Sequence, residues 1–427
     1  MRATLAVALA AGCALLPTGS RAIVRLVPQE HATIQAAVDL SVAGDSVLVG
    51  PGLWAESERR TIQIGGNTQP VTSVLFMKPG VAVIGTAGAE HTTLDGSPTA
   101  STTVIHYLPG SETAVVKGFT ISATAAPSGT ALLPSYASPF HLDSCRIVDS
   151  STGISTVSQT LRVTNSYIAR CGYQFADAVV GWDSHVVFED TIFEGQNDGA
   201  QAIYLWSLDA PSRSLRLIRC TFRDIATLAC QVYDANPLVI EESTFVRCGR
   251  GALLAGGSTG AIRFNTFAYD TSDGGGGAVL NNCDIEVSNN TFYRCRGTLV
   301  AAALSIAFTD GGVHNNIFTG CTGPRGTVSF GGGTQHPSTG CNLFWDNEGD
   351  DFWNDWVPAP TDIEADPEFC NETVLDLTLH STSPAAPANS ACGLLGAFDV
   401  GCGSVSVDAT SWGRLKNLYR SSDHEDR

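Results

Sequence analysis

Charged residues are scarce in this sequence. They make up 15% of its 427 residues, and only three of them are lysines. The 42 acidic residues outnumber the 24 basic ones, which gives a formal net charge of −18. An acidic chain repels the phosphates of nucleic acids and the headgroups of anionic membranes. The composition therefore excludes both as main partners.

Long hydrophobic runs are also rare, and the one present extends from Ala3 to Leu16. Arg2 precedes this run and small residues follow it, which is typical of a secretory signal peptide. We predict that residues 1–22 are removed and that the mature chain has no transmembrane segment. Lipidation at Cys13 is an alternative, which we disfavour because apolar residues continue past it. Loss of residues 1–22 removes two arginines and no acid, so the net charge becomes −20.

Metal-ligand spacing and helical periodicity are largely missing. The nine histidines form no cluster with the spacing of a metal site. Segments such as 273–280 and 298–308 are rich in glycine, serine, threonine and valine and have no helical period. Together with 44 glycines, this favours short strands joined by tight turns.

What the sequence has instead is an internal repeat of 21 to 30 residues. Its reference positions are Ile121, Ile147, Ile168, Ile192, Phe222, Phe245, Phe267, Phe292, Phe318 and Phe344. Five residues earlier, nine of the ten repeats carry a large apolar residue. Two residues earlier, the last four repeats carry Asn265, Asn290, Asn316 and Asn342. If the repeats stack as coils, these columns become a buried aromatic stack and a ladder of amides at a turn.

Two architectures stack units of this length: the leucine-rich repeat and the parallel β-helix. The leucine-rich pattern requires a leucine ten residues before the reference position, and none of the ten repeats has one. We therefore predict an all-β chain that forms a single-stranded parallel β-helix.

A short helix is expected before the coils. Thr33 can cap it, Ile34, Ala37 and Val38 share its apolar face, and Gly44 would end it. Residues 46–49 then read as the first strand. A helix at this position can cover the open end of a stacked core, which otherwise exposes apolar side chains and unpaired strand edges.

The chain resembles a known family in segments near both ends. Thr-Ile-Gln-Ala-Ala-Val at 33–38, Gly-Asp-Ser-Val-Leu-Val at 44–49 and Pro-Gly-Leu-Trp-Ala-Glu at 51–56 resemble the first helix and strand of secreted bacterial right-handed parallel β-helix proteins of the pectin-lyase-like superfamily. Asn-Leu-Phe-Trp-Asp-Asn at 342–347 and the segments around 365–369 and 395–398 resemble their last coils.

This resemblance covers about residues 30–403. It implies a right-handed β-helix over residues 23–403, with 404–427 as a C-terminal tail. The resemblance is specific for the fold and says little about activity, because the matching residues are ones that build coils. Gly-His-Gly, Arg-Ile-Lys and Asp-Pro-His, which mark several enzymes of the superfamily, are all missing. Spacing alone leaves open whether Asp183, Asp209 and Asp234 cluster in space.

The best local candidate for a site is the acidic loop between Trp345 and Trp356. Its carboxylates could bind Ca²⁺, and its indole rings could stack on sugars. The carboxylates are Asp346, Glu348, Asp350 and Asp351, and the rings are Trp345, Trp353 and Trp356. The alternative, which we favour, is an ordinary surface loop whose aromatic residues pack onto the last coils.

Twelve cysteines remain after loss of Cys13, and an exported chain with this number is expected to contain disulfides. Cys295 and Cys321 occupy the same position in consecutive repeats. They can be bridged or can be two stacked, buried thiols, and the sequence does not separate these alternatives.

The sequence predicts a complete β-helix but contains no recognisable group of catalytic residues. This favours a secreted, extracellular or periplasmic protein that binds polysaccharide or another surface component. We expect it to be a monomer and not an enzyme. The alternative is a lyase, glycoside hydrolase or epimerase acting on an acidic polysaccharide. A structural or adhesive surface protein is a third hypothesis.

Overall fold

The computed structural model describes residues 21–403, except 65, 98–101, 124–128, 173–178, 197–199, 207–212, 274, 309, 332–336, 354–356 and the Trp353 side chain. The expected signal peptide, apart from its last two residues, lies outside the described residues. So do Cys13 and the predicted tail at 404–427.

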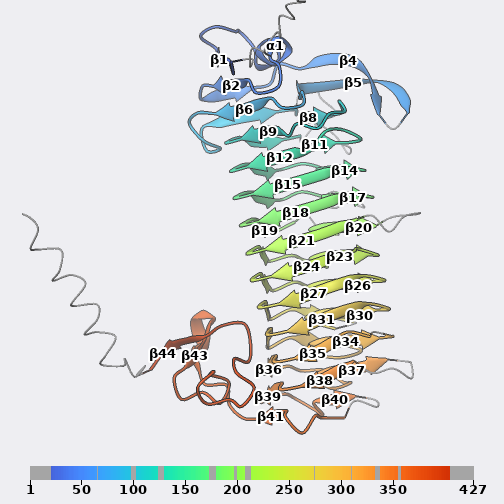
Figure 1. The fold of residues 1–427 in the computed structure, drawn as a ribbon, viewed down its shortest axis with the longest axis vertical. Coiled ribbons are helices and arrows are strands. Elements are labelled where there is room, and N and C mark those ends of the chain that lie inside the picture. Colours follow the sequence, from blue (N-terminus) through green and yellow to red (C-terminus); the bar gives the residue numbers. More distant parts are fainter. Residues whose placement is uncertain are drawn as a thin grey trace, which may run out of the picture.

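The chain winds into a right-handed parallel β-helix, which confirms the predicted fold (Figure 1). Each complete coil contributes one strand to each of three 13-stranded sheets. Sheet A contains β1 (Val24–Val27), β2 (Ser46–Val49), β6 (Ala82–Gly85), β9 (Ala114–Lys117), β12 (Phe140–Asp143), β15 (Thr160–Thr164), β18 (His185–Glu189), β21 (Ser214–Ile218), β24 (Leu238–Glu241), β27 (Thr259–Arg263), β31 (Asp284–Ser288), β35 (Gly312–His314) and β38 (Ser338–Gly340).

Sheet B contains β3 (Gly52–Trp54), β7 (Thr92–Asp95), β10 (Thr120–Ser122), β13 (Arg146–Val148), β16 (Tyr167–Ala169), β19 (Ile192–Glu194), β22 (Thr221–Arg223), β25 (Thr244–Val246), β28 (Thr266–Ala268), β32 (Thr291–Tyr293), β36 (Ile317–Thr319), β39 (Leu343–Trp345) and β41 (Ile363–Glu364). Sheet C contains β4 (Glu58–Ile64), β5 (Asn67–Phe76), β8 (Thr102–His106), β11 (Thr130–Pro134), β14 (Thr152–Val157), β17 (Val179–Trp182), β20 (Ile203–Trp206), β23 (Cys230–Tyr233), β26 (Leu253–Gly256), β30 (Ala278–Asn281), β34 (Leu304–Ala307), β37 (Val328–Gly331) and β40 (Phe352–Trp353).

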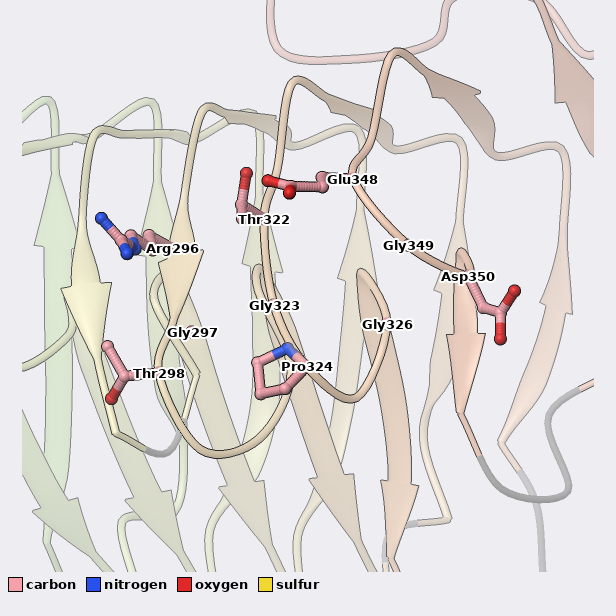
Figure 2. A pocket seen from close by; sticks show the side chains of 10 residues that line it. All are labelled: Arg296, Gly297, Thr298, Thr322, Gly323, Pro324, Gly326, Glu348, Gly349 and Asp350. Carbon is pink, nitrogen blue, oxygen red and sulfur yellow. The ribbon is translucent and has the colours of Figure 1, made fainter.

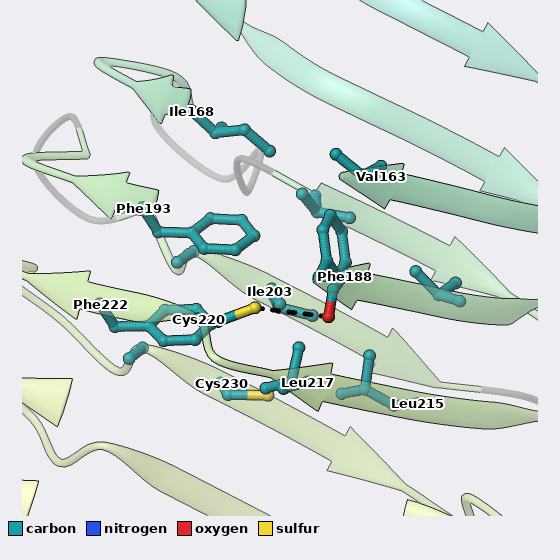
Figure 3. Packing of buried hydrophobic residues seen from close by; sticks show 14 of the residues in the cluster. Val163, Ile168, Phe188, Phe193, Ile203, Leu215, Leu217, Cys220, Phe222 and Cys230 are labelled. Atoms are coloured by element: carbon teal, nitrogen blue, oxygen red, sulfur yellow. Dashed lines mark hydrogen bonds between the residues drawn. The ribbon is translucent and has the colours of Figure 1, made fainter. Parts of the chain in front are cut away.

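A stack of phenylalanine rings fills the interior beneath sheet B. Phe222, Phe245, Phe267, Phe292, Phe318 and Phe344 follow one another at ring-centroid distances of 4.7–5.1 Å and within 10° of parallel. Phe193 continues the stack at 4.5 Å from Phe222 (Figure 3). The repeat position that we assigned to Ile192 therefore belongs to Phe193, and the assignment was wrong by one residue. Ile192 lies on the outward face of β19 and is half-buried.

The asparagine ladder lies at the turn between sheets A and B. Asn265, Asn290, Asn316 and Asn342 are fully buried. The Oδ1 atom of Asn290 accepts hydrogen bonds from the backbone N (3.0 Å) and Nδ2 (3.0 Å) of Asn265. Asn316 and Asn342 repeat these contacts in the next two coils. Each amide thus satisfies backbone groups that a sharp turn would leave unpaired.

A helix and a hairpin mark the N-terminal end. The helix α1 (Ile34–Leu40) is capped by the Thr33 hydroxyl, and Gln35 exchanges two hydrogen bonds with the backbone of Phe76. It ends at Leu40, before the predicted Gly44, because Ser41 adopts extended backbone. Strand β1 precedes it, so β2 is the second strand and not the first. Strands β4 and β5 form an antiparallel hairpin at the start of sheet C.

The last described residues leave the stack and form a C-terminal module of residues 367–403. It contains β42 (Phe369–Asn371), the 3₁₀ turn η1 (Glu372–Val374), β43 (Asp376–His380) and β44 (Val400–Cys402), which make a separate three-stranded sheet. The sequence led us to expect further coils here. Instead, the module packs on the outer face of sheet B, where Leu377 meets Tyr293 and Leu379 meets Ile317 (Figure 1).

Four of the described cysteines form disulfides, Cys341–Cys392 and Cys370–Cys402. The first ties the module to the end of the coils, and the second closes the module itself. Cys295 and Cys321 are free and buried, so of the two alternatives the stacked thiols are present. Burial raises the pKa of the Cys295 thiol well above its usual range, which keeps it protonated.

Candidate functional site

The outward face of sheet C carries no charge between β11 and β37. The strands from β11 to β37 contain no aspartate, glutamate, lysine, arginine or histidine at any position. Sheet A differs, because its outward positions carry ion pairs such as Arg162–Glu189 (2.8 Å) and Arg263–Glu241 (2.6 Å). Charged residues normally dominate exposed positions. Nine consecutive strands without one therefore single out this face in a strongly acidic protein.

Four aromatic side chains form a shelf on this face: Trp182, Tyr204, Trp206 and Tyr233. Their outward direction follows from strand alternation, since Ile203 and Leu205 of β20 point inward and Tyr204 and Trp206 point outward. Figure 3 shows Ile203 inside the coils beneath this part of the sheet.

Three rings of the shelf contact one another, one pair across strands and one pair within β20. Trp182 and Trp206 are register partners, and their ring centroids lie 6.4 Å apart in an edge-to-face arrangement. Tyr204 lies 6.4 Å from Trp206 with the rings 14° from parallel. All four side chains are half-buried. The shelf therefore offers partly exposed ring surface, which suits stacking against the apolar faces of sugars.

The floor beyond the shelf, on strands β26 to β37, is built mostly from small side chains, with Leu254 and Val279 as the larger exceptions. Tyr233 lies against Gly256, where an added Cβ would come within 2.8 Å of Cδ1 of the ring. The Tyr233 hydroxyl accepts a hydrogen bond of 2.7 Å from Nε2 of Gln231. Further along, the outward positions of the next strands are occupied by Leu254, Val279, Asn281, Ser305, Ala307, Ser329 and Gly331. This half of the face is flat and offers hydroxyls and an amide.

Polar groups border the shelf at the turns that lead from sheet C to sheet A. Arg213 is buried, with 4% of its side chain exposed, and it donates from Nε to the backbone O of Asp234 (2.9 Å). Its NH2 group lies 3.3 Å from the carboxylate of Asp234, while NH1 has no hydrogen-bond partner among the described residues. Burial lowers the pKa of Arg213. Oδ1 of Asp183 is also buried without a partner there, so this border retains unused hydrogen-bonding capacity.

The sequence-predicted site is divided between two sheets. Trp345 is the outward residue of β39 in sheet B and is 40% exposed, whereas Trp353 belongs to β40 in sheet C. Trp356 lies outside the described residues. Asp346 follows Trp345 in the left-handed backbone conformation and is exposed. Trp345 and Trp353 therefore belong to strands of different sheets.

The acids of this loop do not converge either. Glu348 and Asp350 line an open pocket of about 550 Å³ with Arg296, Thr298 and Thr322. In Figure 2, Glu348 points toward Thr322, whereas Asp350 points away from it. Asp351 accepts hydrogen bonds from Asn347 (2.8 Å) and Thr327 (3.3 Å), and its burial raises its pKa.

In the described part of the chain, no three or more histidine, cysteine, aspartate or glutamate side chains are grouped to hold a metal ion. No helix in the described ranges is long and apolar enough to cross a membrane.

Sequence reasoning missed the shelf. Its members on successive strands stand 22 to 29 residues apart in repeats of unequal length, so no local motif brings them together. It did single out Asp183 and Asp234, and the structure places both beside Arg213, while Asp209 lies outside the described residues. The signal that could have found the shelf is the recurrence of an aromatic residue at the end of β17, β20 and β23.

Comparison with known proteins gives one family match. A family model described as right handed beta helix region matches residues 103–267 and 201–354, more than half of the chain. No curated protein sequence matches.

Several solved structures resemble the chain. The pectate lyase Pel9A has 15% sequence identity and a TM-score of 0.46, over 89% of this chain and 97% of that one. A family 28 exopolygalacturonase of Yersinia enterocolitica has 10% identity and a TM-score of 0.43, over 81% and 79%. Escherichia coli YbhC has 16% identity and a TM-score of 0.38, over 56% and 76%. At such low identity the likeness concerns the fold alone.

Proposed function

The chain belongs to the right-handed β-helix family, and we propose that it uses this scaffold to bind polysaccharide outside the cytoplasm without chemically changing it. The observation that carries the proposal is the outward face of sheet C, which combines an aromatic shelf with nine strands free of charge. Two disulfides and the signal-like N-terminus support export.

The absence of charged side chains from strands β11 to β37 of sheet C favours binding over catalysis. Hydrolysis, elimination and epimerisation all need an acid or a base within hydrogen-bond reach of the bound sugar, most often a carboxylate or a histidine. These strands supply neither a carboxylate nor a histidine, and their outward acids are the weakly acidic phenols of Tyr204 and Tyr233. The nearest candidates on the sheet A side are Asp183 and Asp234 at the turns, and the arginine between them is already bonded to Asp234.

The enzymatic alternative rests on that same border. Asp183 and Asp234 stand two coils apart, with Arg213 in the coil between them, and each follows an aromatic residue of the shelf. The unpartnered Oδ1 of Asp183 and NH1 of Arg213 could address a substrate. A lyase, hydrolase or epimerase that uses these groups is therefore the second candidate.

Binding can be tested with the mature protein and a panel of soluble polysaccharides in affinity electrophoresis and calorimetry. We expect Trp206→Ala to weaken binding at least about tenfold, because a stacked ring at the centre of a site contributes strongly to affinity. Trp345→Ala is the matched control, since it removes an exposed indole from sheet B. Binding that depends on Trp345 and not on Trp206 would locate the site at the acidic loop instead.

Catalysis is tested by incubating the protein with the same polymers and measuring new reducing ends, unsaturated products and altered uronate stereochemistry. We expect no turnover. Reproducible turnover that Asp183→Asn or Asp234→Asn abolishes, with binding and thermal stability intact, would replace the binding proposal with the enzymatic one.

A further inference from the structure

We infer that the ligand of sheet C is a neutral glycan chain that lies lengthwise along the β-helix. This inference rests on the proposed function and adds the charge of the ligand and its direction. Neither follows from the fold, since a β-helix can present charged side chains on any of its faces, as sheet A does here.

The charge of the ligand follows from the lack of cations on strands β11 to β37 of sheet C. An anionic sugar needs a cation or several hydrogen-bond donors for its carboxylate or sulfate, and a desolvated charge without them is strongly unfavourable. Strands β11 to β37 of sheet C provide no cation. A neutral sugar needs only ring faces, hydroxyls and amides, which Trp182, Tyr204, Trp206, Gln231 and Asn281 supply.

The borders of the floor do not favour an anion. On the sheet A side stand Asp183 and Asp234, the latter with 60% of its side chain exposed. Arg213 is paired with Asp234, and its remaining NH1 group is buried. The loops that lead from sheet B to sheet C carry both arginines and acids, among them Arg250, Asp273, Arg296, Arg325, Glu348 and Asp350. The predicted mature charge of −20 adds a long-range repulsion against polyanions.

The direction of the ligand follows from how the floor is laid out. The shelf occupies β17, β20 and β23, and the mostly small side chains of the floor occupy the next four strands, β26 to β37. Neighbouring strands are about 4.8 Å apart, so these seven strands extend over roughly 30 Å along the axis. One strand across the face is only four residues long. A lengthwise chain therefore contacts both the rings and the small polar floor, whereas a crosswise chain contacts one of them.

The test compares neutral and anionic oligosaccharides of matched length, from two to eight sugars, at low and high salt. The neutral set contains β-glucan, xylan and mannan oligomers, and the anionic set contains polygalacturonate and alginate oligomers. We expect a neutral series to bind with affinity that rises beyond four sugars and changes less than about twofold with salt, because screening acts on charges. Anionic oligomers should bind at least about tenfold more weakly.

Ser305→Arg, with Ser305→Gln as the control for size, tests the floor directly. Ser305 lies outward on β34, beyond the shelf. We expect the arginine variant to gain salt-sensitive binding of anionic oligomers and the glutamine variant not to. Tighter binding of anionic oligomers by the unaltered protein, lost in high salt, would overturn this inference and leave the proposed function intact. So would affinity that does not rise beyond two sugars. No binding of either set would refute the proposed function itself.

Discussion

Phe292 lies in the middle of the phenylalanine stack, fully buried between Phe267 at 4.7 Å and Phe318 at 4.8 Å. Phe292→Ala removes the ring and leaves a cavity that the neighbouring coils cannot close without breaking strand pairing. We expect the unfolding free energy to fall by about 3–5 kcal/mol. Chemical denaturation measures it. A nearly unchanged midpoint would mean that the stack contributes little to stability.

Asp270 lies three residues after Phe267, the residue that its coil contributes to the phenylalanine stack. At the same position, other coils carry side chains that donate a hydrogen bond to a backbone carbonyl of the preceding coil. Gln196 donates to the backbone O of Ile168 (3.0 Å), and Asn347 donates to that of Phe318 (3.2 Å). Asp270 accepts from the backbone N of Cys248 through Oδ1, and Oδ2 is unpartnered among the described residues. Burial raises its pKa to about 8. A protonated carboxyl group fits this position, because it can donate a hydrogen bond as the amides of Gln196 and Asn347 do.

Asp270→Asn should therefore stabilise the protein in a pH-dependent way. The unfolded chain loses the proton of Asp270 near pH 4, whereas the folded protein holds it until about pH 8. Within this window each rise of one pH unit lowers the stability contributed by the aspartate by up to about 1.4 kcal/mol. We expect the asparagine variant to match the parent near pH 4 and to exceed it at pH 8. Urea denaturation at both pH values measures this, with the exposed Asp284→Asn as control.

The register at single residues shows where sequence reasoning succeeds. Six consecutive phenylalanines fixed the repeat from residue 222 onward, and the structure stacks all of them. At Ile192 and Phe193 two large apolar residues are adjacent, and either fits the repeat. A shift of one residue reverses which face a side chain occupies. Only contact with Phe222 decides that Phe193 is inside, and such a contact is not visible in the sequence.

Among the elements, the coils were predictable because they repeat, and α1 was predictable from its cap and its apolar face, whereas two other elements that occur once were not. The β4–β5 hairpin and the C-terminal module have no internal copy to compare with. Their contacts are also distant in sequence, as between Tyr293 and Glu372 (2.8 Å). The aromatic shelf was missed for a similar reason, because its residues meet only after three coils have stacked.

The Cys341–Cys392 disulfide should hold the C-terminal module against the coils. The module also contacts them through hydrogen bonds from Asn289 to the backbone O of Leu394 (2.8 Å) and from Asn315 to that of Cys392 (3.0 Å). We expect the Cys341→Ser/Cys392→Ser variant to lose hydrogen-exchange protection in β42 to β44, because the module then docks only through weaker contacts. Protection in β17 to β32 should be unchanged. Equal loss in both regions would contradict independent docking.

The acidic loop gives a calcium prediction. Asp351 is engaged by Asn347 and Thr327, and Glu348 and Asp350 point in different directions (Figure 2). Calcium needs six to eight oxygen ligands that converge. We therefore expect millimolar Ca²⁺ to leave the melting temperature unchanged, with Mg²⁺ at equal ionic strength as control. A rise specific to Ca²⁺ and abolished by Asp350→Asn would restore the sequence-derived metal hypothesis.

At the scale of the whole molecule, the three faces of the β-helix differ in what they leave accessible. Sheet A is covered with ion pairs, and part of sheet B is covered by the C-terminal module. Sheet C is uncharged over most of its length and carries the shelf. A long sheet face that carries partly exposed aromatic rings and no charge is typical of an interaction site. These differences among the three faces support ligand binding along sheet C.

The ends of the stack require closure as well, and at the N-terminus α1 provides it. Val38 is fully buried against the first coils, whereas Leu40 on the same helix is 61% exposed. Val38→Glu places a charge in the core and should displace the helix, which exposes the edge of the stack. We expect a lower melting temperature and concentration-dependent oligomers in light scattering. Leu40→Glu should remain monomeric with unchanged melting. Identical behaviour of the two variants would mean that the first coils close the core without α1.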